Sequence, residues 1–105
     1  MTAEIRCFWI ERVAEGGFRR ADTGEIRDGM GAWGPGALFA EPDAPEHVHV
    51  FTPGGWANLF SWKRTGDPRQ PETFSAQPSI QTHATHGGRT PWHGYLTNGV
   101  LRQTP

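Results

Sequence analysis

The sequence predicts one small, mainly β domain over residues 1–105, an antiparallel sandwich or partly open barrel with long loops and a C-terminal hairpin. Three observations predict it. Short segments rich in β-branched and aromatic residues are bounded by Gly or Pro. The chain has 14 glycines and 9 prolines, so turns take up much of its length. No long segment shows the 3.6-residue period of a helix.

Five segments carry the strand pattern, namely residues 4–13, 36–41, 47–52, 56–62 and 79–83. The clearest local signal follows them, where Asn98 and Gly99 stand between two short apolar runs. Both residue types tolerate positive φ, as a type I′ turn requires, so we expect a hairpin centred on this pair. A short helix is open as an alternative only around 8–15 or 22–28.

Four turn-rich segments are expected to be loops, namely residues 14–17, 21–36, 64–72 and 84–91. The second is long enough to suggest an excursion with a role of its own.

Aromatic residues compensate for a low hydrophobic content of 35%. The chain has five Trp, six Phe and one Tyr, and each buried aromatic side chain removes roughly 150–250 Å² from water. Disordered chains are poor in aromatics, so the composition predicts a folded domain with a small aromatic core.

The charge is nearly balanced overall, at −1, but it is uneven along the chain. Residues 1–46 carry five Arg and nine acids, whereas residues 47–105 carry five basic residues, two acids and all five His. The balance argues against direct nucleic-acid binding. The uneven halves are either two differently solvated ends of one domain or a mildly basic face that meets an acidic partner.

Cys7 is the single cysteine, so the chain alone forms no disulfide and no thiolate cage for zinc. It lies in an apolar segment, where a thiol is expected to be inert. No apolar run reaches the roughly 20 residues of a membrane span, and residues 1–13 lack the apolar region of a signal peptide. We expect a cytoplasmic protein that does not associate with a membrane.

The histidines raise a metal hypothesis. In a strand, His47 and His49 share a face, and this i, i+2 spacing suits a metal site in a β-barrel. His83, His86 and His93 would supply further ligands, for zinc or iron. The alternative, which we favour, is that His47 and His49 lie on the polar face of an edge strand and that the protein holds no cofactor.

His93 also has a purely structural interpretation. It stands between Trp92 and Gly94, just before the expected hairpin turn. The glycine allows another backbone to come close, so the imidazole would bond a buried carbonyl and hold the hairpin in place.

Enzyme motifs are missing from the sequence. It has no G-x-S-x-G, no P-loop and no dinucleotide fingerprint. We therefore favour a non-enzymatic protein and assign no catalytic residue.

A binding surface is suggested by Trp33, which lies among glycines in the expected loop. Tryptophan is enriched at interface hot spots, so Trp33 is a candidate contact anchor. Two pairs of basic residues are candidates for the rim of such a surface: Arg19 with Arg20, and Lys63 with Arg64. Trp56, Phe60 and Trp62 are expected to share one face of a strand and to pack in the core.

Several segments, taken in order, resemble a group of small phage and prophage proteins of unknown function. They are "RCFWIE", "PGALFAEP", "TPGGWANLFSW", "QPSIQT" and "WHGYLTNGVL". Some members carry the label ammonia monooxygenase, although nothing here suits a membrane copper enzyme. The resemblance implies a phage context and a β-rich domain, and it assigns no activity.

Small phage proteins without catalytic motifs often bind host machinery. We therefore expect a binding protein that acts on a host or phage protein complex in the host cytoplasm, such as an inhibitor of a CRISPR nuclease. One alternative is a histidine-ligated metalloprotein with hydrolytic or oxidative activity. Another is a virion assembly protein, for which homo-oligomerisation would be the sign.

Overall fold

The computed structural model describes residues 4–13, 16–82 and 91–104. They form eleven strands and two short 3-10 helices: β1 (Glu4–Arg6), β2 (Phe8–Arg12), β3 (Gly17–Arg20), β4 (Ile26–Asp28), η2 (Met30–Trp33), β5 (Ala37–Phe39), β6 (His49–Thr52), β7 (Gly55–Asn58), β8 (Lys63–Thr65), η3 (Pro71–Thr73), β9 (Ser75–Thr82), β10 (Trp92–Thr97) and β11 (Val100–Gln103). The predicted mainly β class is confirmed.

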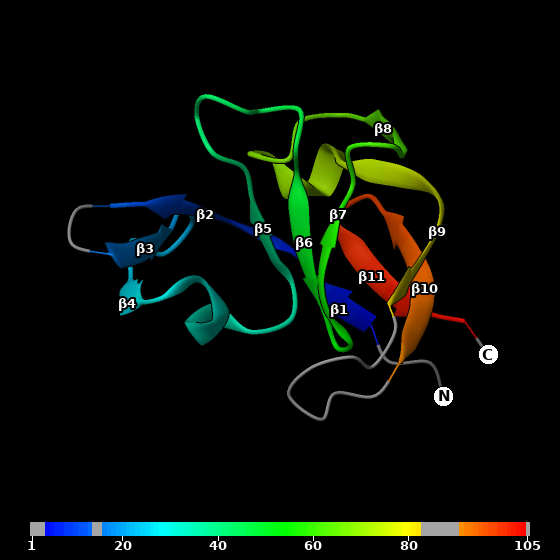
Figure 1. Cartoon of the computed structure of the whole chain (residues 1–105), viewed down its shortest axis with the longest axis horizontal. Helices are drawn as coiled ribbons and strands as arrows, with labels where there is room; N and C mark the ends of the chain where they lie inside the picture. Colours follow the sequence, from blue (N-terminus) through cyan, green and yellow to red (C-terminus); the bar gives the residue numbers. More distant parts are fainter. Residues whose placement is uncertain (1–3, 14–15, 83–90, 105) are drawn as a thin grey trace.

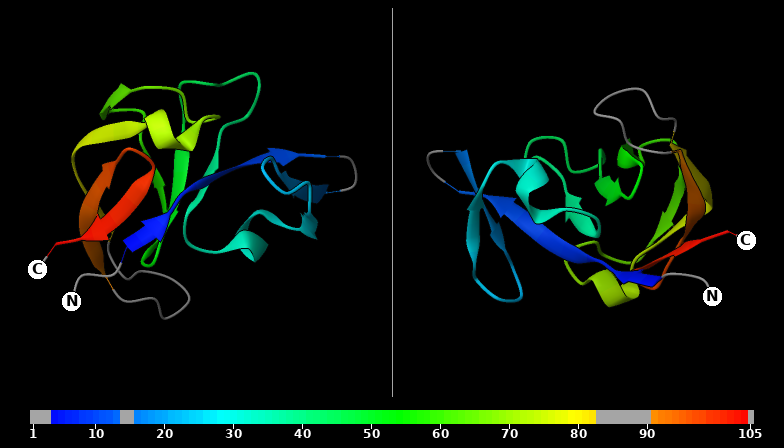
Figure 2. Two further views of the ribbon diagram at one scale, coloured as in Figure 1. Left: turned by 180° about the vertical axis from the view of Figure 1, so that it is seen from behind. Right: turned by 90° about the horizontal axis from the view of Figure 1, so that it is seen from below.

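The strands form two sheets packed as a sandwich, with no closed barrel (Figures 1 and 2). The five-stranded sheet has the order β1-β11-β10-β9-β8, with every pair antiparallel. The six-stranded sheet has the order β4-β3-β2-β5-β6-β7, and only the β2–β5 pair is parallel. Among the described residues, no helix is long and apolar enough to cross a bilayer.

The N-terminal segment passes from one sheet to the other at Cys7. Arg6 still pairs with Val100 of β11, whereas Phe8 already pairs with Ala37 of β5. The sequence predicted one strand over residues 4–13, and the structure divides it in two. The break is not visible in the sequence because both halves are apolar, and the division depends on partners far along the chain.

The six-stranded sheet is apolar on both faces. Side chains alternate along β2, so Cys7 and Trp9 point to one side and Phe8 and Ile10 to the other. The inner cluster lies between the two sheets and takes side chains from both: Cys7, Trp9, Leu38, Ala40, Val48, Val50, Leu59, Phe74, Ala76, Ile80, Trp92, Leu96 and Leu101. The opposite side carries the outer cluster: Phe8, Ile10, Phe18, Trp33, Ala37, Phe39 and Phe51.

The outer cluster is covered by a small arm consisting of β3, β4 and η2 (Figure 1). The sequence predicted a loop over 21–36, and this segment contains β4 and η2. The two alternative helices are wrong, since β2 lies within 8–15 and β4 within 22–28. Strands β3 and β4 were not predicted because "GFRR" and "IRD" are short and charged, with β4 at the sheet edge and β3 beside it.

The predicted strand over 47–52 is confirmed from His49 onward, and His47 lies before it. Val50 packs into the inner cluster and Phe51 into the outer one, as the alternation predicts. Strand β6 lies between β5 and β7, so the edge-strand interpretation of its histidines is wrong.

The prediction that Trp56, Phe60 and Trp62 share a face is wrong. Strand β7 ends at Asn58, whose Oδ1 accepts the backbone N–H of Phe60 at 3.0 Å. Because of this turn, Trp56 packs against the outer cluster and Trp62 against the inner one, and Phe60 is half exposed.

The C-terminal hairpin is confirmed. Thr97 pairs with Val100, and the two turn residues have φ of 48° at Asn98 and 74° at Gly99. Positive φ at both positions is the geometry that this residue pair was expected to supply.

Candidate functional site

The tryptophan predicted to be an exposed anchor is buried. Trp33 is 8% exposed, packs edge-on against Phe8 and donates its indole N–H to the carbonyl of Phe18 at 3.1 Å. Gly29 and Gly34 flank η2 with φ of 83° and 74°. These left-handed backbones turn the helix inward, so the glycines that suggested an exposed loop instead place the indole in the core.

The four basic residues proposed as its rim do not come together. Arg19 and Arg20 lie on β3 in the arm, whereas Lys63 and Arg64 lie on β8 at an edge of the five-stranded sheet (Figure 1). These four residues therefore form no common rim around Trp33.

Arg20 has a structural role in the arm. Its guanidinium lies 4.0 Å above the ring of Phe8 and binds Asp22 with an Nε–Oδ1 distance of 2.6 Å. That hydrogen bond lowers the pKa of the Asp22 carboxyl. Within the described ranges, the one ion pair of Arg19 is with the exposed Glu11 across the β2–β3 ladder, at 3.2 Å.

On β8, the two basic side chains differ. Arg64 donates to the backbone carbonyl of Glu46 and is half buried. Lys63 is exposed and forms no ion pair within the described residues, so it remains accessible to a partner.

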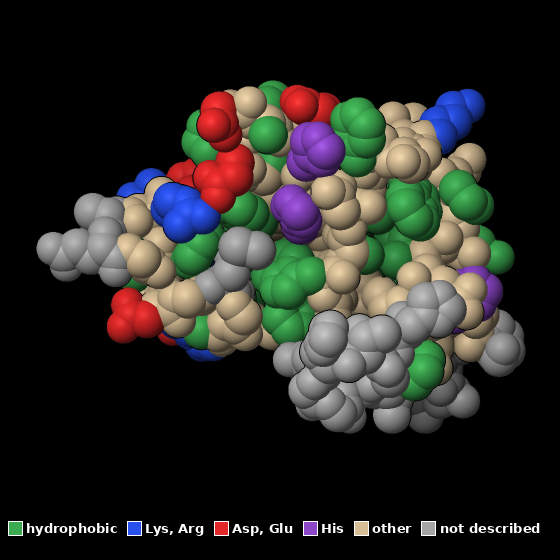
Figure 3. Space-filling model, in the orientation of Figure 1, with side chains coloured by type: hydrophobic (Ala, Val, Ile, Leu, Met, Phe, Trp, Pro, Cys, Tyr) green, Lys and Arg blue, Asp and Glu red, His purple; other side chains and the backbone are tan. Residues whose placement is uncertain are grey.

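His47 and His49 are neighbours in space, but each has a structural environment. Nδ1 of His47 lies 3.1 Å from Nδ2 of Asn58, and its ring stacks on Phe60 at 4.3 Å. His49 is half buried, and burial together with the nearby His47 lowers its pKa. Figure 3 shows histidine side chains gathered with acidic and hydrophobic side chains on this face.

His93 is exposed on β10 and lies between two hydroxyl groups. Its Nε2 is 2.7 Å from Oγ of Ser79, and its Nδ1 is 3.4 Å from Oγ1 of Thr104. The ring thus connects β9, β10 and the residue after β11. This agrees with a hairpin-securing role, through surface hydroxyls rather than the predicted buried carbonyl. The close approach predicted at Gly94 is confirmed, since a Cβ there would lie 2.5 Å from the Arg102 carbonyl.

In the described ranges, no three His, Cys, Asp or Glu side chains are grouped to hold a metal ion. His83 and His86 lie outside those ranges, so the zinc or iron hypothesis stays a prediction. Metal content of untagged protein, compared with the His47→Ala and His93→Ala variants, tests it. About one ion per chain, lost in both variants, would support it.

Cys7 agrees with the expectation of an inert thiol. It is 5% exposed, and burial raises its pKa to about 12. The thiol is therefore protonated at neutral pH and is a poor nucleophile.

The five-stranded sheet carries a surface feature that was not predicted from the sequence. Burial alternates strictly along β10, so Trp92 and Leu96 face the inner cluster and Tyr95 faces outward. Tyr95 is 51% exposed. The alternation in "WHGYLT" carried this signal, but we assigned those residues only to the hairpin.

Tyr95 separates two hollows on the outer face of this sheet. One is lined by Tyr95, Thr97, Asn98, Val100 and Arg102. The other is lined by Lys63, Ala76, Gln77, Pro78, Tyr95 and Thr97. We call these residues together the Tyr95 face. Its two cations lie on either side of the ring, and Arg102 is paired with Glu4 at 2.6 Å.

Comparisons with protein-family models, with curated proteins and with solved structures found no match. We therefore argue function from the residues and their contacts.

Proposed function

We propose that this protein is a non-enzymatic binding protein that contacts a partner protein complex through the Tyr95 face. The observation that carries the proposal is the half-exposed Tyr95 ring between two hollows. Tyrosine is among the residues that supply most of the binding energy at interfaces, because its ring buries a large area at a small entropic cost. The hollows beside it would receive side chains of the partner.

The polar groups around Tyr95 suit a protein surface. Thr97, Asn98 and Gln77 offer hydroxyl and amide groups for adaptable hydrogen bonding. Lys63, which has no ion pair among the described residues, adds a positive charge at one hollow, and Arg102, paired with Glu4, lies at the other. Cations placed in this way favour an acidic partner surface and speed its association.

The resemblance to phage proteins supports a host defence complex, such as a CRISPR nuclease, as the first class of partner to test. An inhibitor of this kind would act in the host cytoplasm by occupying a surface that the complex needs. No turnover is required of it, in keeping with the non-enzymatic proposal.

The experiment adds the purified protein to a panel of purified CRISPR nuclease complexes and measures target cleavage and complex binding. We expect inhibition of at least one complex, reduced tenfold or more by Tyr95→Ala. The matched control is Phe60→Ala, which removes an aromatic ring of equal exposure, 50%, from another face. Inhibition that survives Tyr95→Ala but not Phe60→Ala would contradict the proposed surface. Absence of binding across the panel would contradict the proposed partner class.

A further inference from the structure

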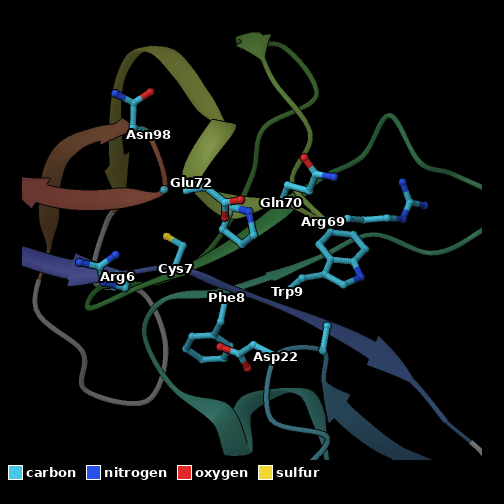
Figure 4. A pocket seen from close by; sticks show the side chains of 12 residues that line it. Arg6, Cys7, Phe8, Trp9, Asp22, Arg69, Gln70, Glu72 and Asn98 are labelled. Atoms are coloured by element: carbon cyan, nitrogen blue, oxygen red, sulfur yellow. The ribbon is translucent and has the colours of Figure 1, made fainter.

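A separate cavity of about 350 Å³ lies where the chain passes between the sheets at Cys7 (Figure 4). Its lining comes from four segments, residues 6–9, 21–22, 69–72 and 98–99. Neither the hypotheses from the sequence nor the proposed binding face uses it, apart from Asn98, which borders both.

The frame of the cavity is held by backbone contacts. The N–H of Cys7 donates to the carbonyl of Gly99 at 2.7 Å, and the N–H of Gly99 donates to the carbonyl of Phe74 at 2.9 Å. A Cβ at Gly99 would lie 2.3 Å from the Pro71 carbonyl, so the hairpin turn sits directly on η3. The walls are therefore fixed before any ligand enters, which lowers the cost of binding.

Part of the lining is apolar. Trp9, 5% exposed, and Pro71 lie on it, whereas the ring of Phe8 points to the opposite side of β2. The guanidinium of Arg69 lies 5.4 Å from the ring centroid of Trp9, so a positive charge stands beside this aromatic wall. The indole N–H of Trp9 is buried and has no acceptor among the described residues.

The remaining polar side chains of the lining are free to bind a ligand. Among the described residues, Arg6, Gln70, Glu72 and Asn98 have no side-chain partner, while Asp22 is already bound by Arg20. Arg69 reaches only Asp67, at 4.0 Å. Figure 4 shows Arg6 and Arg69 towards opposite sides of the view, with Gln70 and Glu72 between them.

We propose that this cavity binds a small aromatic carboxylate that carries a hydroxyl or amino group. The ring of the ligand lies against Trp9 and Pro71, and its carboxylate faces Arg69. Glu72 and Gln70 accept hydrogen bonds from the hydroxyl or amino group, and Arg6 adds positive potential at the far side. Each polar group of such a ligand has a counterpart in the lining.

The test compares three probes of one shape and different charge: 4-hydroxybenzoate, 4-hydroxybenzamide and 4-hydroxybenzamidine. Binding is followed by two-dimensional NMR of the five tryptophan indole N–H groups, with Trp9 assigned from Trp9→Phe. We expect the Trp9 signal to move most with 4-hydroxybenzoate. We also expect its Kd to be at least tenfold lower than that of the amidine. Arg69→Met should abolish this preference, whereas Arg19→Met, outside the cavity, should preserve it.

Two results would overturn the proposal: no movement of the Trp9 signal with 10 mM 4-hydroxybenzoate, or equal or tighter binding of the amide or amidine. Both residues chosen for substitution are exposed arginines, so both variants should fold, and their unchanged NMR spectra away from the cavity check this. The test involves no partner protein, so its outcome is independent of the proposed function.

Discussion

The two faces of the six-stranded sheet are covered in different ways. The inner cluster has thirteen buried residues and is closed by a second sheet, mostly with aliphatic side chains. The outer cluster has only seven, four of them Phe or Trp on β2, β3, β5 and η2, with Phe51 as the fifth aromatic. A few large rings can therefore replace a second layer of sheet, because each aromatic ring removes more surface from water than an aliphatic side chain does.

The rim of the outer cluster is made of arginines rather than of further strands. Arg12 lies 5.0 Å from the ring of Phe18, and Arg27 lies 4.3 Å from the ring of Trp33. Together with Arg20 on Phe8, these guanidinium groups cover ring faces with their planes and stems while keeping their charge in water. The basic residues of the arm thus contribute to its packing.

The largest effects should come from truncating one phenylalanine in each cluster. Phe39 and Phe74 are 2% and 1% exposed, and removing either ring leaves a cavity. We expect each Phe→Ala change to lower the free energy of unfolding by about 3–5 kcal/mol in urea titrations. In hydrogen exchange, Phe39→Ala should expose the amides of β3 and β4 first. A loss below 1 kcal/mol at Phe39 would show that the outer cluster is not a core.

A smaller effect is expected at Gly94, which belongs to the inner side. A Cβ there would meet the Arg102 carbonyl and the Trp92 ring, both at 2.5 Å. Gly94→Ala should therefore cost about 1–3 kcal/mol through overpacking, measured by thermal or urea unfolding. The control is Gly24→Ala, where a Cβ would meet nothing within 4 Å and only the positive φ is strained. Equal losses at the two glycines would contradict the packing argument.

The arginine rim can be tested with two adjacent residues. Arg20 stacks on Phe8 and binds Asp22, whereas Arg19 makes only an exposed pair with Glu11. We expect Arg20→Met to cost about 1 kcal/mol and Arg19→Met less than about 0.5 kcal/mol, by urea unfolding at low salt. Equal costs would mean that stacking on the rings adds nothing.

The smallest effect concerns pH. Burial and the nearby His47 lower the pKa of His49 in the folded protein, against an opposing effect of Glu41. The unfolded chain therefore binds a proton more readily, and this part of the stability is lost as the pH falls below about 6.5 towards the lower pKa of His49 in the folded protein. Between pH 7 and 5, His49→Gln should show a shallower fall in the free energy of unfolding than the unchanged chain. An identical slope would contradict the assigned environment.

The sequence could predict the parts of the fold that depend on the conformational preferences of neighbouring residues. The Asn98-Gly99 turn depends only on which residues tolerate positive φ, so its hairpin was predicted correctly. The division at Cys7 could not be predicted, because it depends on whether β11 or β5 lies alongside. The same holds for the end of β7 at Asn58, where a side-chain hydrogen bond starts a turn.

The candidate surface was harder to predict than the fold. Glycines beside Trp33 suggested an exposed loop, but they allow η2 to fold onto the sheet and bury the indole. The opposite mistake concerns Tyr95, which was not predicted to be exposed. Its outward position nevertheless follows from the alternation of side chains along β10. The exposure of an aromatic residue depends on what packs on it, and that is set by distant parts of the chain.

Urea unfolding of Trp33→Ala and Tyr95→Ala, measured side by side, tests most directly whether Trp33 belongs to the core and Tyr95 to the contact surface. A buried tryptophan with a hydrogen-bonded indole should cost about 3–5 kcal/mol on truncation, whereas a half-exposed tyrosine on a sheet face should cost less than about 1 kcal/mol. We expect that large difference. Losses that are equal, or larger for Tyr95→Ala, would contradict it.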